Sequence, residues 1–221
     1  DGPGTWEECA GPGRKTTLDQ GTMPIQIVRN YVNNAVRFDI DQIIWDPCTV
    51  GNTTTVPEPS FIRQDANNNY IGTINKMVFF RNRMVMLSDE NIIMSQPGDF
   101  YNFWPRSAIT YSATDVIDVS CSSEYPAIVY DAIQVNSGLV IFTKNQQFML
   151  TTDSDVLSPQ TVKINSLASY NFNHKTNPIS LGTTIGFLDN AGKHSRFWEV
   201  AKILREGEPI VVDQSKVVQK L

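Results

Sequence analysis

Histidine and cysteine, which usually carry catalysis or hold metal ions, are scarce in this sequence of 221 residues. There are two histidines, His174 and His194, both in polar stretches, and no G-x-S-x-G elbow accompanies them. The three cysteines, Cys9, Cys48 and Cys121, form no C-x-x-C pair. An odd, scattered set does not make a disulfide framework, so we expect reduced thiols. The sequence thus predicts no metal site, no cofactor and no histidine-based catalysis.

Long apolar runs and an excess of positive charge are also missing. No run approaches the ~20 apolar residues of a membrane helix, so we expect no membrane span. The net charge of −5 argues against a nucleic-acid-binding surface, which needs clustered Lys and Arg. No phosphate-binding glycine loop occurs. What remains, 41% hydrophobic and 19% charged residues, is typical of an ordered globular protein with a substantial core.

Carboxylates leave two weaker possibilities for chemistry. A glycosidase places two carboxyl groups about 5–9 Å apart, and Asp39 and Asp41 would share one face of a strand. The same stretch is equally typical of a strand with its Asp residues in solvent and Phe38 and Ile40 facing the core. The segment 65–69 (DANNN) is similar to the start of a calcium loop, but Tyr70 stands where such a loop needs Gly and no Glu closes it. We therefore expect a polar turn there.

Short apolar runs bounded by Gly, Pro, Asn and Asp recur along the chain, while helical periodicity is rare. Two hairpins are predicted with five residues on each side of a two-residue turn. The first covers residues 84–95 and turns at Asp89 and Glu90, and the second covers residues 139–150 and turns at Lys144 and Asn145. A third, looser hairpin over residues 184–200 would turn at residues 190–192.

The first two hairpins lie in a repeated context. An apolar run precedes each one (77–80 and 127–130), and another strand follows after an excursion (116–120 and 161–165). The recurrence at about 45 to 55 residues is typical of four-stranded propeller blades, although a chance series of β-meanders is the alternative. The predicted fold class is all-β, with propeller-like repeated antiparallel sheets and long inter-strand loops.

Both hairpins contain consecutive apolar residues, from Met84 to Leu87 and from Leu139 to Phe142. A sheet with one wet face would alternate apolar and polar residues, so a continuous run predicts that both faces are covered. Blades stacked around an axis cover their inner strands in this way. Because each buried side chain contributes about 1.5–3 kcal/mol, these strands should form the most stable part of the protein.

Residues 46–60 contain three prolines and no apolar period, and they begin a predicted loop excursion over residues 46–70. We interpret residues 1–221 as part of one β-propeller-like platform domain, and expect the full protein to be longer at both ends. Because loops on rigid sheets carry contacts, residues 46–60 and 166–177 are the predicted interaction loops.

The aromatic stretch from Met94 to Pro105 allows two interpretations. Phe100, Tyr101 and Trp104 would stack on sugar rings if they were exposed. Alternatively, the aromatic side chains fasten the excursion onto the sheet, while Asp99 and Asn102 bond to the local backbone. We favour the second interpretation.

The run from Phe79 to Trp104 (FFRNRMVMLSDENIIMSQPGDFYNFW) resembles the signature of the tail tubular protein B family, the nozzle proteins of short-tailed, podovirus-type bacteriophages. The resemblance continues in residues 115–118, 139–150 and 157–162, with short matches at 21–24 and 213–215. The sequence departs from the family signature at Met84, Met86 and Trp104, all apolar exchanges that leave the fold intact. The signature residues are structural: Arg81, Asn82, Arg83, Asp89, Asn91, Gly98, Asp99, Phe100, Asn102 and Trp104.

The resemblance implies a non-enzymatic structural component of the phage tail, made in the host cytoplasm. Proteins of this family form a homo-hexamer below the tail adaptor ring protein, in a tail that also carries tail fibres, and enclose the channel for genome ejection. The net charge of −5 agrees with transient passage of genomic DNA without tight binding, because each neutralised phosphate would slow the duplex. The alternative is a carbohydrate-binding or carbohydrate-degrading β-propeller of a phage tail.

Overall fold

The computed structural model describes residues 4–67, 69–121, 126–191, 194–201 and 209–217. Within these residues the chain forms fourteen β-strands and one 3-10 helix (Gln214–Val217), and no α-helix. Every strand pairing is antiparallel. The all-β prediction is therefore confirmed.

Three four-stranded sheets follow one another along the chain, each with its strands in sequence order. The first sheet contains β3 (Ile74–Phe80), β4 (Arg83–Ser88), β5 (Asn91–Met94) and β6 (Ile117–Ser120). The second contains β7 (Val129–Val135), β8 (Gly138–Thr143), β9 (Gln147–Thr152) and β10 (Val162–Ala168). The third contains β11 (Ile179–Ser180), β12 (Ile185–Ala191), β13 (His194–Ala201) and β14 (Ile210–Asp213). The unit of strand, hairpin, excursion and strand is thus present in the first two sheets, while closure into a propeller stays a prediction.

The first two hairpin turns lie where the sequence places them. Ser88 pairs with Asn91 across the β4–β5 turn, where Asp89 has a φ of 49°. In the β8–β9 turn the amide of Thr143 donates to the carbonyl of Gln146 over 2.9 Å. The third turn was misplaced, because β12 continues to Ala191 and β13 begins at His194. Asn190 and Ala191, which were predicted to turn, pair with Ser195 and His194 and so lengthen the ladder. Gly192 of the predicted turn lies outside the described residues.

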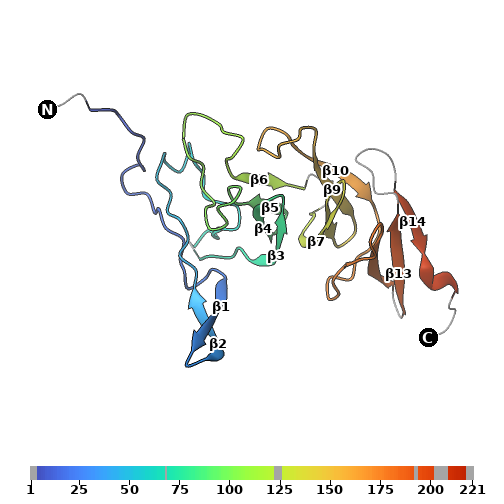
Figure 1. The fold of residues 1–221 in the computed structure, drawn as a ribbon. Coiled ribbons are helices and arrows are strands. Elements are labelled where there is room, and N and C mark those ends of the chain that lie inside the picture. Colours follow the sequence, from blue (N-terminus) through green and yellow to red (C-terminus); the bar gives the residue numbers. More distant parts are fainter. Residues whose placement is uncertain (1–3, 68, 122–125, 192–193, 202–208, 218–221) are drawn as a thin grey trace.

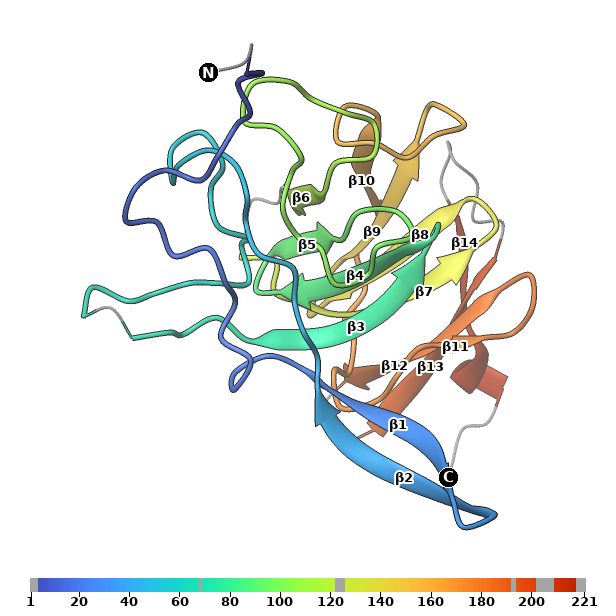
Figure 2. The same ribbon diagram turned by 60° about the vertical axis from the view of Figure 1, so that its left-hand side comes forward.

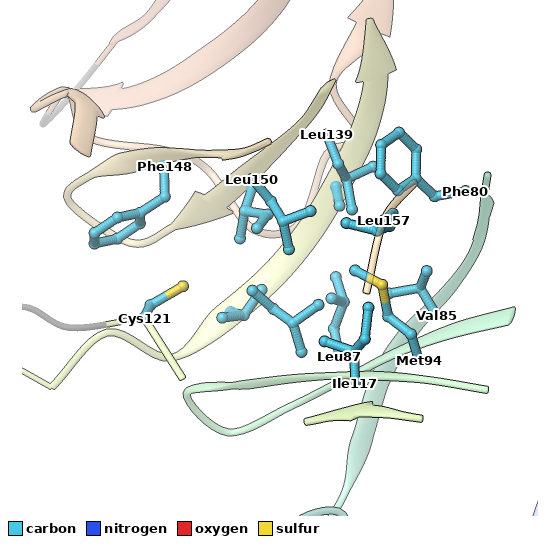
Figure 3. Close-up of a cluster of buried hydrophobic side chains, with 14 of the residues drawn as sticks. Phe80, Val85, Leu87, Met94, Ile117, Cys121, Leu139, Phe148, Leu150 and Leu157 are labelled. Carbon is cyan, nitrogen blue, oxygen red and sulfur yellow. The ribbon is translucent and has the colours of Figure 1, made fainter. Parts of the chain in front are cut away.

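The second sheet is covered on both faces. Leu139 and Ile141 of β8 point into a buried cluster shared with the first sheet, where Val85 and Leu87 of β4 meet them (Figure 3). The intervening Val140 and Phe142 point the other way, into a cluster with Ile185, Phe187 and Val200 of the third sheet. Because strand side chains alternate between faces, the apolar run of β8 fills two interfaces at once, as predicted.

The outer face of the first sheet is covered differently. Met84 and Met86 of β4 and Ile93 of β5 pack against irregular segments rather than against another sheet. These segments supply the buried side chains of Leu18, Ile43, Trp45, Cys48, Val50, Val56, Phe61, Phe103 and Trp104. The prediction of neighbouring sheets on both sides is therefore right for β8 and wrong for one face of β4.

A two-stranded ribbon projects from this body, formed by β1 (Ile25–Val32) and β2 (Ala35–Gln42) (Figure 2). Its turn consists of Asn33 and Asn34, whose φ values of 50° and 60° suit the tight turn of a two-residue hairpin. Phe38 and Ile40 were expected to face the core, but both are exposed, because no described element covers the ribbon. Residues 46–67, 69 and 70 contain only isolated bridges, such as Gln64 with Tyr70.

Candidate functional site

Four of the signature residues, Arg81, Asn82, Arg83 and Gly98, meet at the tight turn between β3 and β4. Arg81 and Asn82 occupy that turn with φ values of 45° and 59°, and Arg83 begins β4 with its side chain buried to 1% exposure. The amide of Gly98, itself at a φ of 78°, donates to the carbonyl of Asn82 over 2.8 Å. Glycine suits this position because other residues rarely adopt that backbone conformation. The turn therefore anchors the start of the aromatic excursion.

The guanidinium group of Arg83 ties two excursions to the sheet: the β5–β6 excursion and the β9–β10 excursion. Its Nη1 donates to the carbonyls of Ser95 and Asp115, both over 2.7 Å. Its Nη2 donates to the carbonyls of Ala113 and Leu157, over 3.1 and 3.2 Å. Leu157 belongs to the second sheet's excursion and lies 74 residues after Arg83, so this one side chain links the excursions of two sheets. We call this arrangement the Arg83 hub.

The charge of Arg83 is balanced mainly by backbone dipoles. Burial lowers the pKa of Arg83, and the nearby carboxylate of Asp115 raises it. That carboxylate is itself occupied, because it accepts the amide protons of Ser112 over 2.6 Å and Arg106 over 3.3 Å. A buried arginine with its donors on carbonyls is suited to holding loops in place rather than to binding an external anion.

The aromatic excursion docks onto the N-terminal segment through Trp104. Its Nε1 donates to the carbonyl of Asp46 over 3.1 Å, and the Arg14 guanidinium lies 5.2 Å from the ring centroid. Gln96 holds the other side, donating from Nε2 to the Trp104 carbonyl over 2.8 Å and accepting from Arg106 Nε over 2.8 Å. Trp104 is 3% exposed, so the sugar-stacking interpretation is wrong for this residue. Phe100 packs edge-on against Phe79, with the two ring centroids 5.2 Å apart.

The polar signature residues divide between local and long-range bonds. Asn102 Oδ1 accepts the amide proton of Trp104 over 3.0 Å, which is the local bond predicted for it. The carboxyl group of Asp99 acts on that of Asp46: the pKa of Asp46 is raised by burial first and then by the charge and hydrogen bonding of Asp99.

Asp89 and Asn91 connect the β4–β5 turn to its surroundings. The carboxylate of Asp89 pairs with Arg63 at 2.9 Å, and its carbonyl accepts the amide proton of Val129 over 2.7 Å, which joins the first sheet to the second. Asn91 begins β5 and pairs in register with Ser120 of β6. The signature therefore connects the first two sheets with the irregular N-terminal segments that contain Asp46 and Arg63.

The weaker chemical possibilities are not assembled into a reactive site. Asp39 and Asp41 share a face of the exposed ribbon, but Asp39 is held by Arg37 and by Asn30 Nδ2. The carboxylate of Asp65 accepts the amide protons of Asn67 and Asn69 over 2.8 and 2.9 Å, as in an ordinary polar turn.

The residues considered for metal binding or thiol chemistry are dispersed. In the described part of the chain, no three His, Cys, Asp or Glu side chains are placed to hold a metal ion. The ring of His174 stacks on that of Tyr130, with the centroids 4.7 Å apart, and His194 is the first residue of β13. Cys9, Cys48 and Cys121 are free thiols. The described helices also include none that is long and apolar enough to cross a membrane.

Arg83 was predicted as a structural residue of the signature, but its role as a hub was not predicted, and neither was the β1–β2 ribbon. An arginine placed directly before four apolar strand residues is the signal for the hub, because such a charge must be buried with partners. The Asn33-Asn34 pair between alternating segments is the signal for the ribbon.

Comparison with known proteins gives two findings. The sequence model of the family described as bacteriophage nozzle protein matches residues 1–221. The chain is also 32% identical, over 182 residues, to Tail tubular protein gp12 of Escherichia phage T7. That match covers 82% of this chain and 21% of the phage T7 protein, so the chain spans about a fifth of the length of this relative.

Proposed function

This chain belongs to the bacteriophage nozzle protein family, and from that premise we propose that it forms a rigid β-sheet wall in the tail of its phage. Its role is structural, and it acts within the virion rather than as an enzyme. The phage T7 relative carries the name of a tail tubular protein, which agrees with a wall-forming role.

The two-sided burial of the second sheet carries this proposal. The side chains of β8 and β9 are all buried, and they fill one interface with the first sheet and another with the third. Interiors packed in this way have low compressibility and transmit force without deforming. The Arg83 hub adds a polar fastening between the excursions of the first two sheets. A conduit that withstands the passage of a genome needs this kind of stiffness.

We further propose that the complete protein assembles as a homo-hexamer next to the tail adaptor ring protein and the tail fibres, around the channel for genome ejection. The net charge of −5 supports transient passage of genomic DNA. Tight binding requires Lys and Arg side chains that neutralise phosphates and release the counterions of the DNA, and an acidic wall does not favour this. Propeller-like closure of the sheets, contacts through residues 46–60 and 166–177, and synthesis in the host cytoplasm belong to the same proposal.

The carbohydrate alternative is not favoured. It requires an open aromatic platform, but Trp104 is buried under Arg14 and Phe100 is packed on Phe79. Of the aromatic residues considered for stacking, only Tyr101 exposes more than a third of its surface. One half-exposed ring is too little for a sugar-binding face.

Electron cryo-microscopy of the intact phage tests the proposed function. We expect density that fits the three sheets within the tail, arranged in a ring with six-fold symmetry around a central channel. A map in which these sheets lie in the capsid or in a fibre would overturn the proposal. A ring with another symmetry would leave the wall-forming role in place and overturn the hexamer.

A further inference from the structure

One face of the β1–β2 ribbon is apolar and uncovered by any described part of the chain. The register pairs Ile27 with Ile40 and Tyr31 with Val36, and side chains of paired residues lie on the same face. The exposed fractions of the apolar side chains on this face are 56% for Ile25, 70% for Ile27, 68% for Tyr31, 46% for Val36, 67% for Phe38 and 73% for Ile40. The opposite face carries the polar bonds of Asn30, Arg37 and Asp39.

This face is large for a surface that stays in water. Its six apolar side chains expose roughly 600 Å² together, which is at or above the largest apolar patch of a typical monomer. A stable protein–protein interface buries about 800 Å² on each partner, so this ribbon alone supplies most of one side. An isolated two-stranded ribbon is also marginally stable in water, and covering its apolar face would stabilise it.

A surface of matching character lies elsewhere on the same chain. A pocket of about 270 Å³ is lined largely by apolar side chains of residues 55–59 and 103–118, with Ile93 and Pro159, and its rim includes Ile109 and Tyr111, which are 79% and 81% exposed. The apolar lining residues are Val56, Pro57, Pro59, Ile93, Phe103, Pro105, Ala108, Ile109, Tyr111, Val116 and Pro159. The loop between β5 and β6, which carries residues 105–115, lies above the first sheet in both views, whereas the ribbon projects below it (Figures 1 and 2).

The charges on the two surfaces are complementary. Arg29 is the one charged residue on the apolar face of the ribbon, next to Phe38 in the register, and its guanidinium lies over Tyr31 at 5.1 Å. The described lining of the pocket contains Glu58, Asp115 and Asp118 but no Lys or Arg. Opposite charges of this kind set the orientation of a contact between apolar surfaces.

We propose that the apolar face of the β1–β2 ribbon of one copy docks over the 270 Å³ pocket of a second copy of this chain, with Arg29 beside the partner's Glu58. Because the ribbon projects on the other side of the first sheet from this loop, the described part of one copy does not dock its ribbon on its own pocket, and each copy offers both surfaces to its neighbours. Such a head-to-tail contact repeats from copy to copy and closes into a ring when the rotation permits. The inference thus rests on the proposed ring and names its contact surfaces.

A matched pair of ribbon variants of the complete gene product tests the contact. Val36 lies on the apolar face and Val32 on the other, both beside the turn, with exposed fractions of 46% and 44%. We expect Val36→Ser, and more strongly Phe38→Ser, to raise the protein concentration needed for assembly at least tenfold in analytical ultracentrifugation, while Val32→Ser leaves it unchanged. Circular dichroism and thermal melting of each variant establish that it is folded.

A charge exchange tests whether the pocket is the surface on which the ribbon docks. Arg29→Glu and Glu58→Arg should each weaken assembly about tenfold, and the double variant should recover most of the loss. Weakening by the ribbon variants without any effect of Glu58→Arg or Ile109→Ser would overturn docking into the pocket, because the ribbon would then contact another surface. Unchanged assembly of Phe38→Ser would overturn the inference as a whole. Neither result touches the proposed function, which fails only when the wild-type protein is absent from the phage tail.

Discussion

The guanidinium group of Arg83 shows how a single residue controls loop positions in this protein. It is 1% exposed and donates to four carbonyl groups, three in the β5–β6 excursion and one in the β9–β10 excursion. A long apolar side chain of similar volume would fill the space but leave these carbonyls without a donor, and each unsatisfied buried group costs about 1–3 kcal/mol.

We therefore expect Arg83→Met to lower the free energy of unfolding by about 3–5 kcal/mol. Urea denaturation followed by tryptophan fluorescence measures this change. Arg81→Met is the matched control, because Arg81 is exposed and its hydrogen bond to the Asp155 carbonyl is long, at 3.4 Å. Equal losses in the two variants would contradict the hub.

The Asp46–Asp99 pair makes the docking of the aromatic excursion depend on pH. Because the pKa of Asp46 is raised above 3.8 in the folded protein, the folded state binds this proton more tightly than the unfolded state does. Its stabilising contribution is therefore complete below about pH 3.8 and is lost as the pH rises through the raised pKa.

Asp46→Asn removes this titration while keeping a neutral side chain of the same size beside Asp99. We expect the melting temperature of the variant to fall less than that of the wild type as the pH rises from about 4 to 7. Asp65→Asn serves as the opposite case, because backbone and side-chain hydrogen bonds from Asn69, then that from Asn67, lower the pKa of Asp65. Parallel pH profiles for the wild type and Asp46→Asn would contradict the raised pKa of Asp46.

At the scale of secondary-structure elements, the run Leu139–Phe142 of β8 is the clearest case of sequence determining burial. Alternate side chains enter different interfaces, and all of them are nearly inaccessible. In a strand with one wet face, truncating neighbouring residues would give alternating large and small losses.

Here we expect Ile141→Ala and Phe142→Ala both to be costly, by about 2–5 and 3–5 kcal/mol respectively. The two losses should also be nearly additive, because the side chains lie on opposite faces of the sheet. Chemical denaturation of the two single variants and the double variant provides the measurement. A loss below about 1 kcal/mol for either residue would show that its face is not a packed interface.

The sequence predicted these elements because the information is local. A two-residue turn between apolar runs specifies a hairpin, and an unbroken apolar run specifies two covered faces. Which element covers a face is not local, and for that reason the irregular layer over Met84 and the exposed side of Phe38 were not foreseen. The same holds for Trp104, whose burial depends on the carbonyl of Asp46, 58 residues earlier in the chain.

At the scale of the whole molecule, the buried clusters differ in what surrounds them. The cluster containing Cys121 lies between two sheets, whereas the cluster containing Cys48 lies between the first sheet and irregular segments. Segments without a strand ladder open more readily than paired strands, because fewer bonds must break together. The irregular segments around Cys48 should therefore open before the sheets separate.

The three thiols allow this order of opening to be measured. Cys9 is exposed, while Cys48 and Cys121 are buried, and burial raises the pKa of Cys121 to about 12. Since the thiolate is the reactive form, we expect rapid alkylation of Cys9 alone in the native protein at pH 8. As urea is added, Cys48 should become reactive at a lower concentration than Cys121, as followed by peptide mass spectrometry. A Cys9→Ser variant removes the fast reaction and isolates the other two. Labelling of Cys121 at or before the concentration that exposes Cys48 would show that the packed sheets, rather than the irregular layer, are the weaker part of the wall.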